Sequence, residues 1–389
     1  MLGLRVGLPC SVKTSWCSGK AVPMVFLAAN LCTEPVSAVL GSAASPHIWL
    51  YICDKSSRVS VMCQRNNWAP DSQDQLKSKG MGTKIAVNEY TKLEGHKQGV
   101  YALSWLESER CLLSAGGDGA VVKWDLAGIQ PQVPVTGKLH AQLPEPIFCM
   151  MQGGDGVIWA GTQGGLVFKL EVGASPRMMK LGTSSVFFIS RWMDGRIAVG
   201  LGSGELVFLD DAFEVVSRLK LGERSLRCCI GSEGLIGGSD GVVWRLNALG
   251  EVLSVRTANQ PSVFCLAKMD DDSFVSGGRD AQLWWHKDGA EETVKAHLYT
   301  IHALMLEPSE GRWLASGGMD KSIKIWDAQN TTLLKVVDRS KFPNFGHTHS
   351  VNALAWLGEV DGLDVSRVGR RLLASAGDDK IIRIWAVSV

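Results

Sequence analysis

Short apolar runs alternate with glycine-rich polar turns along most of the chain, and no helical period of apolar residues interrupts them. One pattern of apolar and polar positions recurs at 114–125 (SAGGDGAVVKWD), 316–327 (SGGMDKSIKIWD) and 375–386 (SAGDDKIIRIWA). In each copy an Asp lies four residues after a Ser, and a Trp lies six residues after the Asp. Upstream stands a run of the type V-x-A-L, preceded by a His at four residues' distance. These copies predict an internal repeat built of strands and turns.

Weaker copies fill the middle of the chain. Segment 276–287 keeps Ser276 and Asp280 but has His286 in place of Trp, and Asn259 stands where the His is expected. Segments 237–247, 201–211 and 161–171 keep the turn glycines and the apolar strand. Seven units therefore end their third strands at Trp124, Leu170, Leu209, Leu246, His286, Trp326 and Trp385, mostly 37 to 46 residues apart.

A repeat of this length with four strands has the size of a propeller blade. Two dipeptides, Gly-His at 95–96 and 346–347 and Trp-Asp at 124–125 and 326–327, resemble the signatures of the WD-repeat β-propeller family. The resemblance covers residues 84–389 and implies an all-β, seven-bladed β-propeller of four-stranded antiparallel blades. The degenerate middle blades make the chain similar to single-domain WD-repeat proteins of bacteria.

The chain ends predict how the ring closes. Only four residues follow Trp385, so the seventh unit lacks a fourth strand, while the extended segment 84–94 precedes the first unit and belongs to none. We expect segment 84–94 to pair with the strand 381–387 and to complete the last blade, which leaves no open edge there.

The repeated Ser, His, Asp and Trp are the residue types of a hydrolase, but a nucleophile site needs one constellation with an oxyanion hole. Recurrence at constant spacing instead indicates a structural hydrogen-bond chain, in which Trp donates, Ser and His bridge, and Asp accepts. The predicted members are His96, Ser114, Asp118 and Trp124; His297, Ser316, Asp320 and Trp326; and His347, Ser375, Asp379 and Trp385. We expect no catalytic residue and no enzyme activity.

Residues 1–80 share none of the repeat and form a predicted separate, non-propeller extension. They hold five of the ten cysteines and carry a net charge of +4, against −3 for the remainder. A complete propeller could begin at Met81, so we interpret 1–80 as a disordered tail or as sequence upstream of the true start. An apolar stretch at 21–32 leaves a signal peptide or a transit peptide as alternatives.

Composition narrows the possible partners. Lys and Arg number 40 against 39 Asp and Glu and do not cluster, so nucleic-acid binding is not expected. No apolar run reaches the length of a membrane-spanning helix. No zinc spacing or phosphate loop occurs, and Asp270–Asp272 fits a solvated turn better than a calcium site, so no metal and no cofactor are expected. Cysteines in apolar strands, Cys228 and Cys229 among them, indicate buried thiols in the cytoplasm rather than a redox pair.

A scaffold that binds a protein or peptide at one mouth of the ring is the predicted function. The inner strand of each blade lines the channel, so the position after the first apolar residue of its run should stand at that mouth. These positions are Tyr101, Phe148, Phe187, Arg227, Phe264, His302 and Asn352, and Arg279, Met319 and Asp378 before the turn Asp should flank them. Aromatic residues and Arg are typical of binding hot spots.

Three alternatives remain open. The aromatic residues of the mouth could merely pack between blades. The channel could hold an enzyme pocket, for which His302 is the one candidate residue. A reader of histone tails would need acidic side chains at the mouth. Sequence alone does not name the partner, and a closed ring has no edge that requires oligomerisation, so we expect a monomeric ring.

Overall fold

The computed structural model describes residues 85–389 except 155, 258–260, 270–272, 288–289, 341–343 and 359–370, together with four strands nearer the N-terminus. Those four strands form two antiparallel pairs, β1 (Val12–Ser15) with β2 (Met24–Leu27) and β3 (His47–Cys53) with β4 (Val59–Arg65). The chain divides into two compact units, Met1–Met81 and Gly82–Val389. The interpretation of residues 1–80 as a tail or as upstream sequence stays a prediction.

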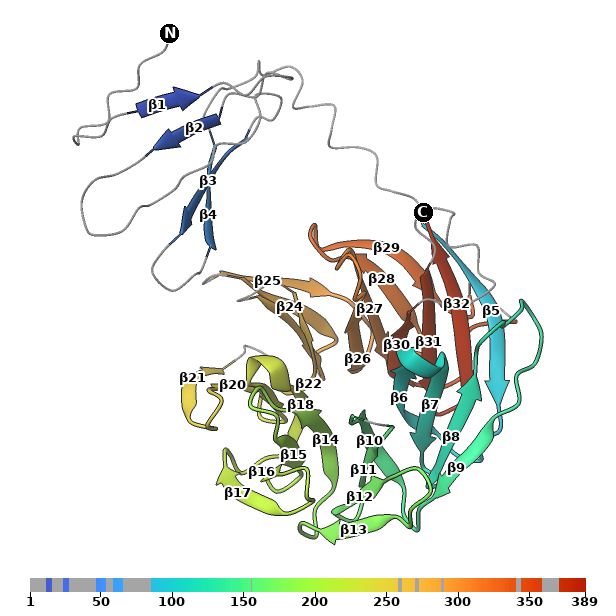
Figure 1. The fold of residues 1–389 in the computed structure, drawn as a ribbon. Helices are drawn as coiled ribbons and strands as arrows, with labels where there is room; N and C mark the ends of the chain where they lie inside the picture. The colour runs from blue at the N-terminus through green and yellow to red at the C-terminus, as the bar shows by residue number, and fades with distance from the viewer. Residues whose placement is uncertain are drawn as a thin grey trace. The chain divides into compact units, whose positions relative to one another are not determined.

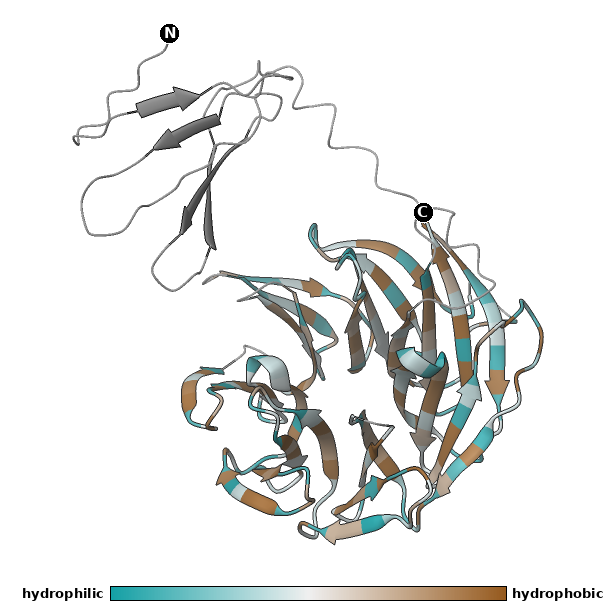
Figure 2. Cartoon of the chain, in the orientation of Figure 1, coloured by the Kyte–Doolittle hydropathy of each residue, from teal (hydrophilic) through white to brown (hydrophobic). Residues whose placement is uncertain are grey.

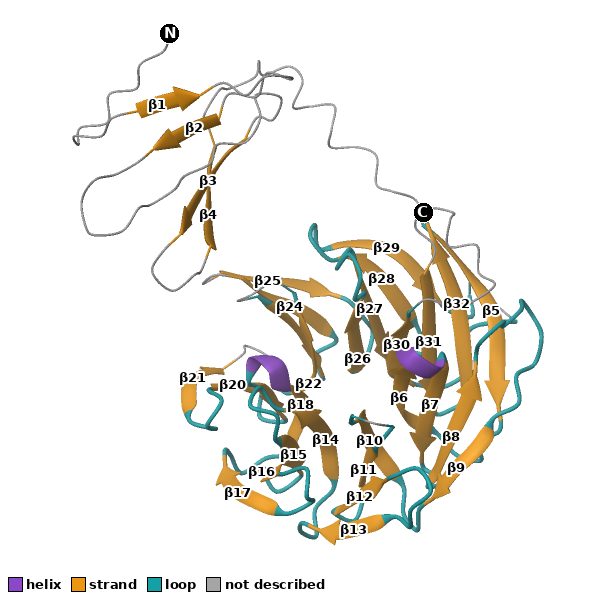
Figure 3. Cartoon of the chain, in the orientation of Figure 1, coloured by secondary structure: helices purple, strands orange, loops and turns teal. Residues whose placement is uncertain are grey.

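Seven four-stranded antiparallel sheets make up the second unit and form a ring of blades, as Figure 1 shows. Six of the sheets pair their strands in chain order, because glycine turns connect apolar runs that follow one another directly, and the seventh takes its fourth strand from the N-terminal end of the unit. The described residues contain no α-helix, only two short 3₁₀ helices, η1 (Glu107–Glu109) and η2 (Gly231–Glu233), in Figure 3. The predicted seven-bladed β-propeller is confirmed.

The strands have the following bounds. Blade 1 comprises β6 (Val100–Leu106), β7 (Cys111–Gly116), β8 (Ala120–Asp125) and β9 (Lys138–Gln142); blade 2 comprises β10 (Ile147–Gln152), β11 (Ile158–Thr162), β12 (Leu166–Leu170) and β13 (Arg177–Lys180). Blade 3 comprises β14 (Val186–Arg191), β15 (Ile197–Leu201), β16 (Glu205–Leu209) and β17 (Val215–Lys220); blade 4 comprises β18 (Leu226–Ile230), β19 (Leu235–Gly238), β20 (Val242–Leu246) and β21 (Val252–Thr257). Blade 5 comprises β22 (Val263–Lys268), β23 (Phe274–Gly278), β24 (Gln282–Lys287) and β25 (Ala290–Lys295). Blade 6 comprises β26 (Ile301–Leu306), β27 (Trp313–Gly318), β28 (Ile323–Asp327) and β29 (Thr332–Val337); blade 7 comprises β30 (Val351–Leu357), β31 (Arg371–Gly377), β32 (Ile381–Ser388) and β5 (Ala86–Glu94).

The two ends of the propeller meet in blade 7. Strand β5 pairs antiparallel with β32 along its whole length, from Ala86 opposite Ser388 to Glu94 opposite Ile381. A buried ion pair between Glu89 and Arg383, with an oxygen–nitrogen distance of 2.5 Å, links the same two strands. The predicted closure by the N-terminal strand is therefore confirmed.

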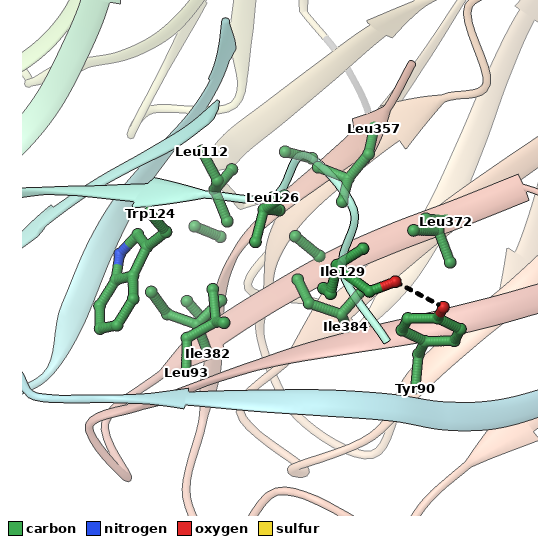
Figure 4. Packing of buried hydrophobic residues seen from close by; sticks show 14 of the residues in the cluster. Tyr90, Leu93, Leu112, Trp124, Leu126, Ile129, Leu357, Leu372, Ile382 and Ile384 are labelled. Carbon is green, nitrogen blue, oxygen red and sulfur yellow. Dashed lines mark hydrogen bonds between the residues drawn. The ribbon is translucent and has the colours of Figure 1, made fainter. Parts of the chain in front are cut away.

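Apolar side chains pack between neighbouring blades, and Figure 2 shows hydrophobic and hydrophilic residues alternating along the strands. Figure 4 shows the contact between blades 7 and 1, where Leu93 of β5 and Ile384 of β32 pack with Trp124 of β8. The hydroxyl of Tyr90 donates a hydrogen bond of 3.0 Å to the carbonyl of Ile129 in the same cluster. The closing strand thus lies against the first blade as well as the last.

Candidate functional site at the mouth of the ring

The innermost strands of the seven blades lie side by side around the ring. They follow in the order β6, β10, β14, β18, β22, β26 and β30, and β30 in turn contacts β6. Each begins immediately after a loop that enters from the preceding blade, so the first residues of all seven strands stand at one mouth.

Every inner strand carries a β-bulge directly after its first residue. The first residue is fully buried in each case, and the pairing with the second strand shifts by one residue across the next position. A bulge leaves its extra residue unpaired and re-aims the side chain. The seven bulge residues are Tyr101, Phe148, Phe187, Arg227, Phe264, His302 and Asn352, all half-buried between buried neighbours on one side or both. They are the seven positions that the sequence singles out.

Three aromatic bulge residues touch one another in blades 1 to 3. The rings of Tyr101 and Phe148 meet edge to face, with centroids 5.6 Å apart and an angle of 86°. The rings of Phe148 and Phe187 stack at 5.9 Å and 17°. Contacts of this kind stabilise by about 0.5–1.5 kcal/mol each. The rings contact neighbours, as the packing alternative expects, and yet stay half-exposed at the mouth.

Blade 4 adds a cation to this row of contacting side chains at the mouth, called the arc below. The guanidinium carbon of Arg227 lies 3.9 Å from the ring centroid of Phe187 and 4.5 Å from that of Phe264, so Arg227 lies between two aromatic faces. The exposed Arg279 lies 5.9 Å from the same Phe264 ring. Burial lowers the pKa of Arg227, and the charge of Arg279 lowers it further.

The arc continues through blade 5 into blades 6 and 7. The ring of His302 stacks on Phe264 at 6.3 Å and 4°, and burial lowers the pKa of His302. In blade 7, Asn352 Nδ2 donates a hydrogen bond of 2.7 Å to Asp378 Oδ1. Met319 is exposed in its turn. The mouth therefore has a cationic side over blades 4 and 5 and an acidic group over blade 7.

Sequence reasoning missed two exposed residues of this face. Leu298 and Tyr299, in the loop before β26, have exposed fractions of 73% and 60%. They lie between His297 and the apolar run that begins at Ile301, and the repeat marks only the His and the run.

Hydrogen-bond chains fix the loops of the mouth in blades 1, 6 and 7. In blade 6, Trp326 Nε1 donates to Ser316 Oγ at 2.9 Å, and Ser316 Oγ lies 2.8 Å from His297 Nε2. Because the Asp320 carboxylate can only accept, His297 Nδ1 donates to Asp320 Oδ1 at 2.9 Å, and the other ring nitrogen then accepts from the Ser316 hydroxyl. Blades 1 and 7 have the same bonds among His96, Ser114, Asp118 and Trp124 and among His347, Ser375, Asp379 and Trp385.

Blades 2 and 5 use other side chains where this set is missing. In blade 5, Ser276 Oγ lies 2.9 Å from His286 Nε2, and Asp280 accepts from Trp284 Nε1 at 2.8 Å. In blade 2, Thr162 Oγ1 donates to Glu145 Oε2 at 2.7 Å, which ties the same loop to the same strand. Asn259 lies outside the described residues, so its position in blade 5 stays untested.

Metal binding, thiol chemistry and membrane insertion can each be checked in the described part of the chain. No group of three or more His, Cys, Asp or Glu side chains there could hold a metal ion, and Asp270–Asp272 lies outside it. Burial raises the pKa of the Cys228 thiol to about 12 and that of Cys229 still further, which disfavours a reactive thiolate pair. No helix in the described segments has both the length and the apolar character needed to cross a membrane.

Comparison with known proteins identifies repeats in three places. The family model "WD domain, G-beta repeat" matches residues 88–125, 291–327 and 340–386. Nuclear distribution protein PAC1 of Gibberella zeae is 34% identical over 120 residues, which cover 30% of this chain and 24% of that protein. Protein HIRA of Dictyostelium discoideum is 33% identical over 95 residues, covering 23% and 8%. The chain thus spans about a quarter or less of the length of these curated relatives.

A solved structure extends the likeness around the ring. The WD40 β-propeller domain of Doa1 superposes with a TM-score of 0.62 over 77% of this chain and 96% of that domain, at 16% sequence identity, which shows the fold alone. Similarity to single-domain bacterial WD-repeat proteins stays a prediction, since the relatives above are from a fungus and from Dictyostelium. The protein therefore carries WD40 repeats, set in a seven-bladed β-propeller.

Proposed function

We propose that this propeller is a non-catalytic scaffold that binds a protein or peptide partner at the mouth lined by the seven bulge residues. The observation that carries the proposal is the bulge itself, because each blade turns a half-exposed side chain into the mouth at the same point. Four of the seven side chains are aromatic and a fifth is Arg, types that dominate the energetics of protein interfaces. WD40 propellers generally serve as interaction scaffolds rather than as catalysts.

The alternatives receive less support from the same geometry. A reader of basic histone tails needs acidic side chains, whereas Asp378 is the one acidic residue among the ten predicted mouth residues and is hydrogen-bonded to Asn352. An enzyme in the channel would depend on His302, which stacks on Phe264 and has Asp378 and Arg227 as its charged neighbours. The relatives' names refer to nuclear distribution, but so short a match supports no more than the interaction role. A cytoplasmic, monomeric ring stays part of the proposal.

Affinity capture with the full chain tests the proposal. Wild type and the double variant Tyr101→Ala/Arg227→Ala are used as bait in a lysate of the native organism, with Leu253→Ala/Val255→Ala on the exposed outer strand β21 as matched control. The mouth variant should recover the partner several-fold less well than the control does. Each truncation removes one or two ring contacts, so the melting temperature should fall by only a few degrees. Normal recovery by the folded mouth variant contradicts the proposal.

A further inference from the structure

Two guanidinium groups at the mouth face one aromatic ring, and neither forms an ion pair with a carboxylate among the described residues. Arg227 and Arg279 both lie over Phe264, and the charge of Arg279 contributes to lowering the pKa of Arg227 by repulsion between like charges. Within the part of the chain that the structure describes, no carboxylate lies within ion-pair distance of either one. An anion supplied by a ligand would relieve this repulsion and satisfy the free donors.

An exposed apolar patch lies on the loop and turn of blade 6, next to the turn that carries Arg279. Leu298, Tyr299 and Met319 of blade 6 have exposed fractions of 73%, 60% and 51%. The backbone N–H of His297, directly before Leu298, donates to the carbonyl of Ala281 at 3.0 Å, two residues after Arg279. The loop of blade 6 is therefore fastened to the very turn that carries Arg279.

This patch is also held in place. Leu298 N donates to Asp320 Oδ2 at 3.0 Å, and Met319 N donates to the carbonyl of Thr300 at 2.8 Å. Large apolar side chains that are exposed on fixed loops mark interaction sites, because their burial by a partner costs little ordering of the protein.

We propose that this part of the mouth binds a peptide segment in which an anionic side chain lies next to a large apolar one. The proposal rests on the proposed function and specifies its ligand. The anionic group, a carboxylate or a phosphate, binds Arg227 and Arg279, and the apolar side chain packs on Leu298, Tyr299 and Met319. Two cations beside one apolar patch are too few to follow a nucleic-acid backbone, which requires many phosphate contacts.

Selection from a random dodecapeptide library displayed on phage, against the full chain, provides the probes. Enriched peptides are synthesised with Glu, phosphoserine or Gln at the acidic position, and their affinities are measured by fluorescence anisotropy. The Gln peptide should bind roughly tenfold more weakly or worse than the better anionic one, since a charged hydrogen-bonded pair is lost. The stronger of the Glu and phosphoserine peptides identifies the source of the anion.

Charge reversal tests the same contact from the protein side. Arg279 is exposed, so Arg279→Glu leaves the fold intact, and Arg256→Glu on the exposed strand β21 is its matched control. We expect roughly a tenfold loss of affinity for Arg279→Glu and a change within about twofold for the control. Leu298→Ser should weaken binding likewise, compared with Leu253→Ser on the outer strand.

The outcomes separate this inference from the proposed function. If peptides lose binding in the Tyr101→Ala/Arg227→Ala variant but bind equally with Gln, or bind Arg279→Glu as well as its control, the inference is wrong and the scaffold function stands. If enriched peptides are indifferent to every mouth variant, or if no peptide is enriched, both proposals are overturned.

Discussion

Asp320→Ala is the change whose cost follows most directly from the structure. The Asp320 carboxylate accepts from His297 Nδ1 at 2.9 Å, from Leu298 N at 3.0 Å, and from the backbone N–H and hydroxyl of Ser322 at 3.1 and 2.7 Å. The side chains of His297 and Ser322 are both buried. Alanine therefore removes the acceptor of two buried donors at once.

The magnitude depends on how far those donors can find another partner. A buried donor left without an acceptor costs about 1–3 kcal/mol. Ser322 Oγ lies 3.2 Å from His297 Nδ1, so in the variant it can accept the hydrogen bond that His297 donates to Asp320. The loss at His297 is therefore only partial. We expect Asp320→Ala to lower the free energy of unfolding by about 2–3 kcal/mol.

Asp240→Ala is the matched control. Asp240 occupies the same turn position in blade 4, but it is exposed and accepts a bond from the backbone N–H of Val242. Its removal should cost less than about 0.5 kcal/mol. Urea denaturation followed by tryptophan fluorescence measures both, and with an m-value of about 2–3 kcal/mol/M the Asp320 variant should shift its midpoint by roughly 1 M. Equal midpoints for the two variants would refute the reasoning from buried donors.

Three further predictions concern the closure, the response to acid and the thiols. Arg383→Leu should destabilise the propeller by about 3–5 kcal/mol in thermal unfolding, because it removes the buried cation of Glu89 and leaves only the more distant Lys92, at 3.7 Å. Adding Glu89→Leu should restore part of the loss. Burial lowers the pKa of His347 below 6.5. Burial alone would raise the pKa of Asp379, but the hydrogen bond with His347 and the charge of His347 lower the Asp379 pKa below 3.8. At both residues the unfolded chain binds the proton at a higher pH than the folded protein does. The midpoint of thermal unfolding should therefore fall as the pH drops below about 6.5, and more steeply below about 4. A midpoint that stays constant from pH 7 to 3 contradicts this. With its pKa near 12, Cys228 should resist iodoacetamide in the native protein and react only in urea, as peptide mass spectrometry would show.

The blade pattern was predictable because it is local. Alternating apolar residues and glycine turns fix where a strand starts and ends, so the third strand of every unit was found, and so was the missing strand that β5 supplies. The bulges were not predictable. They depend on the hydrogen-bond register between two strands, for example the shift between Val100 and Ala102 opposite β7, and no residue type in the sequence marks them.

Contacts between distant residues were also beyond the sequence. Glu89 and Arg383 lie 294 residues apart, and Glu89 belongs to no copy of the repeat. Arg383 stands where the other two clear copies have Lys324 and Val122, so the repeat does not mark it as half of an ion pair. Glu145 and Thr162 replace the His and Ser of other blades, so a search for the repeated residue types passes over them. The exposure of Leu298 follows from a loop whose backbone is bonded to Asp320, which periodicity does not encode.

The repeated hydrogen-bond network also holds in place the loops that carry the residues of the mouth. A bulge can present its side chain at a fixed place only if the loop before it and the turn beside it are held to each other, and in blade 6 the bond from Leu298 N to Asp320 does this. The same aspartate is anchored through His297 and Ser316 to Trp326, deep in the blade. Rigidity that originates in the core therefore reaches the exposed loop, and in blade 2, which lacks the His-Asp pair, the bond from Thr162 to Glu145 fixes the corresponding loop.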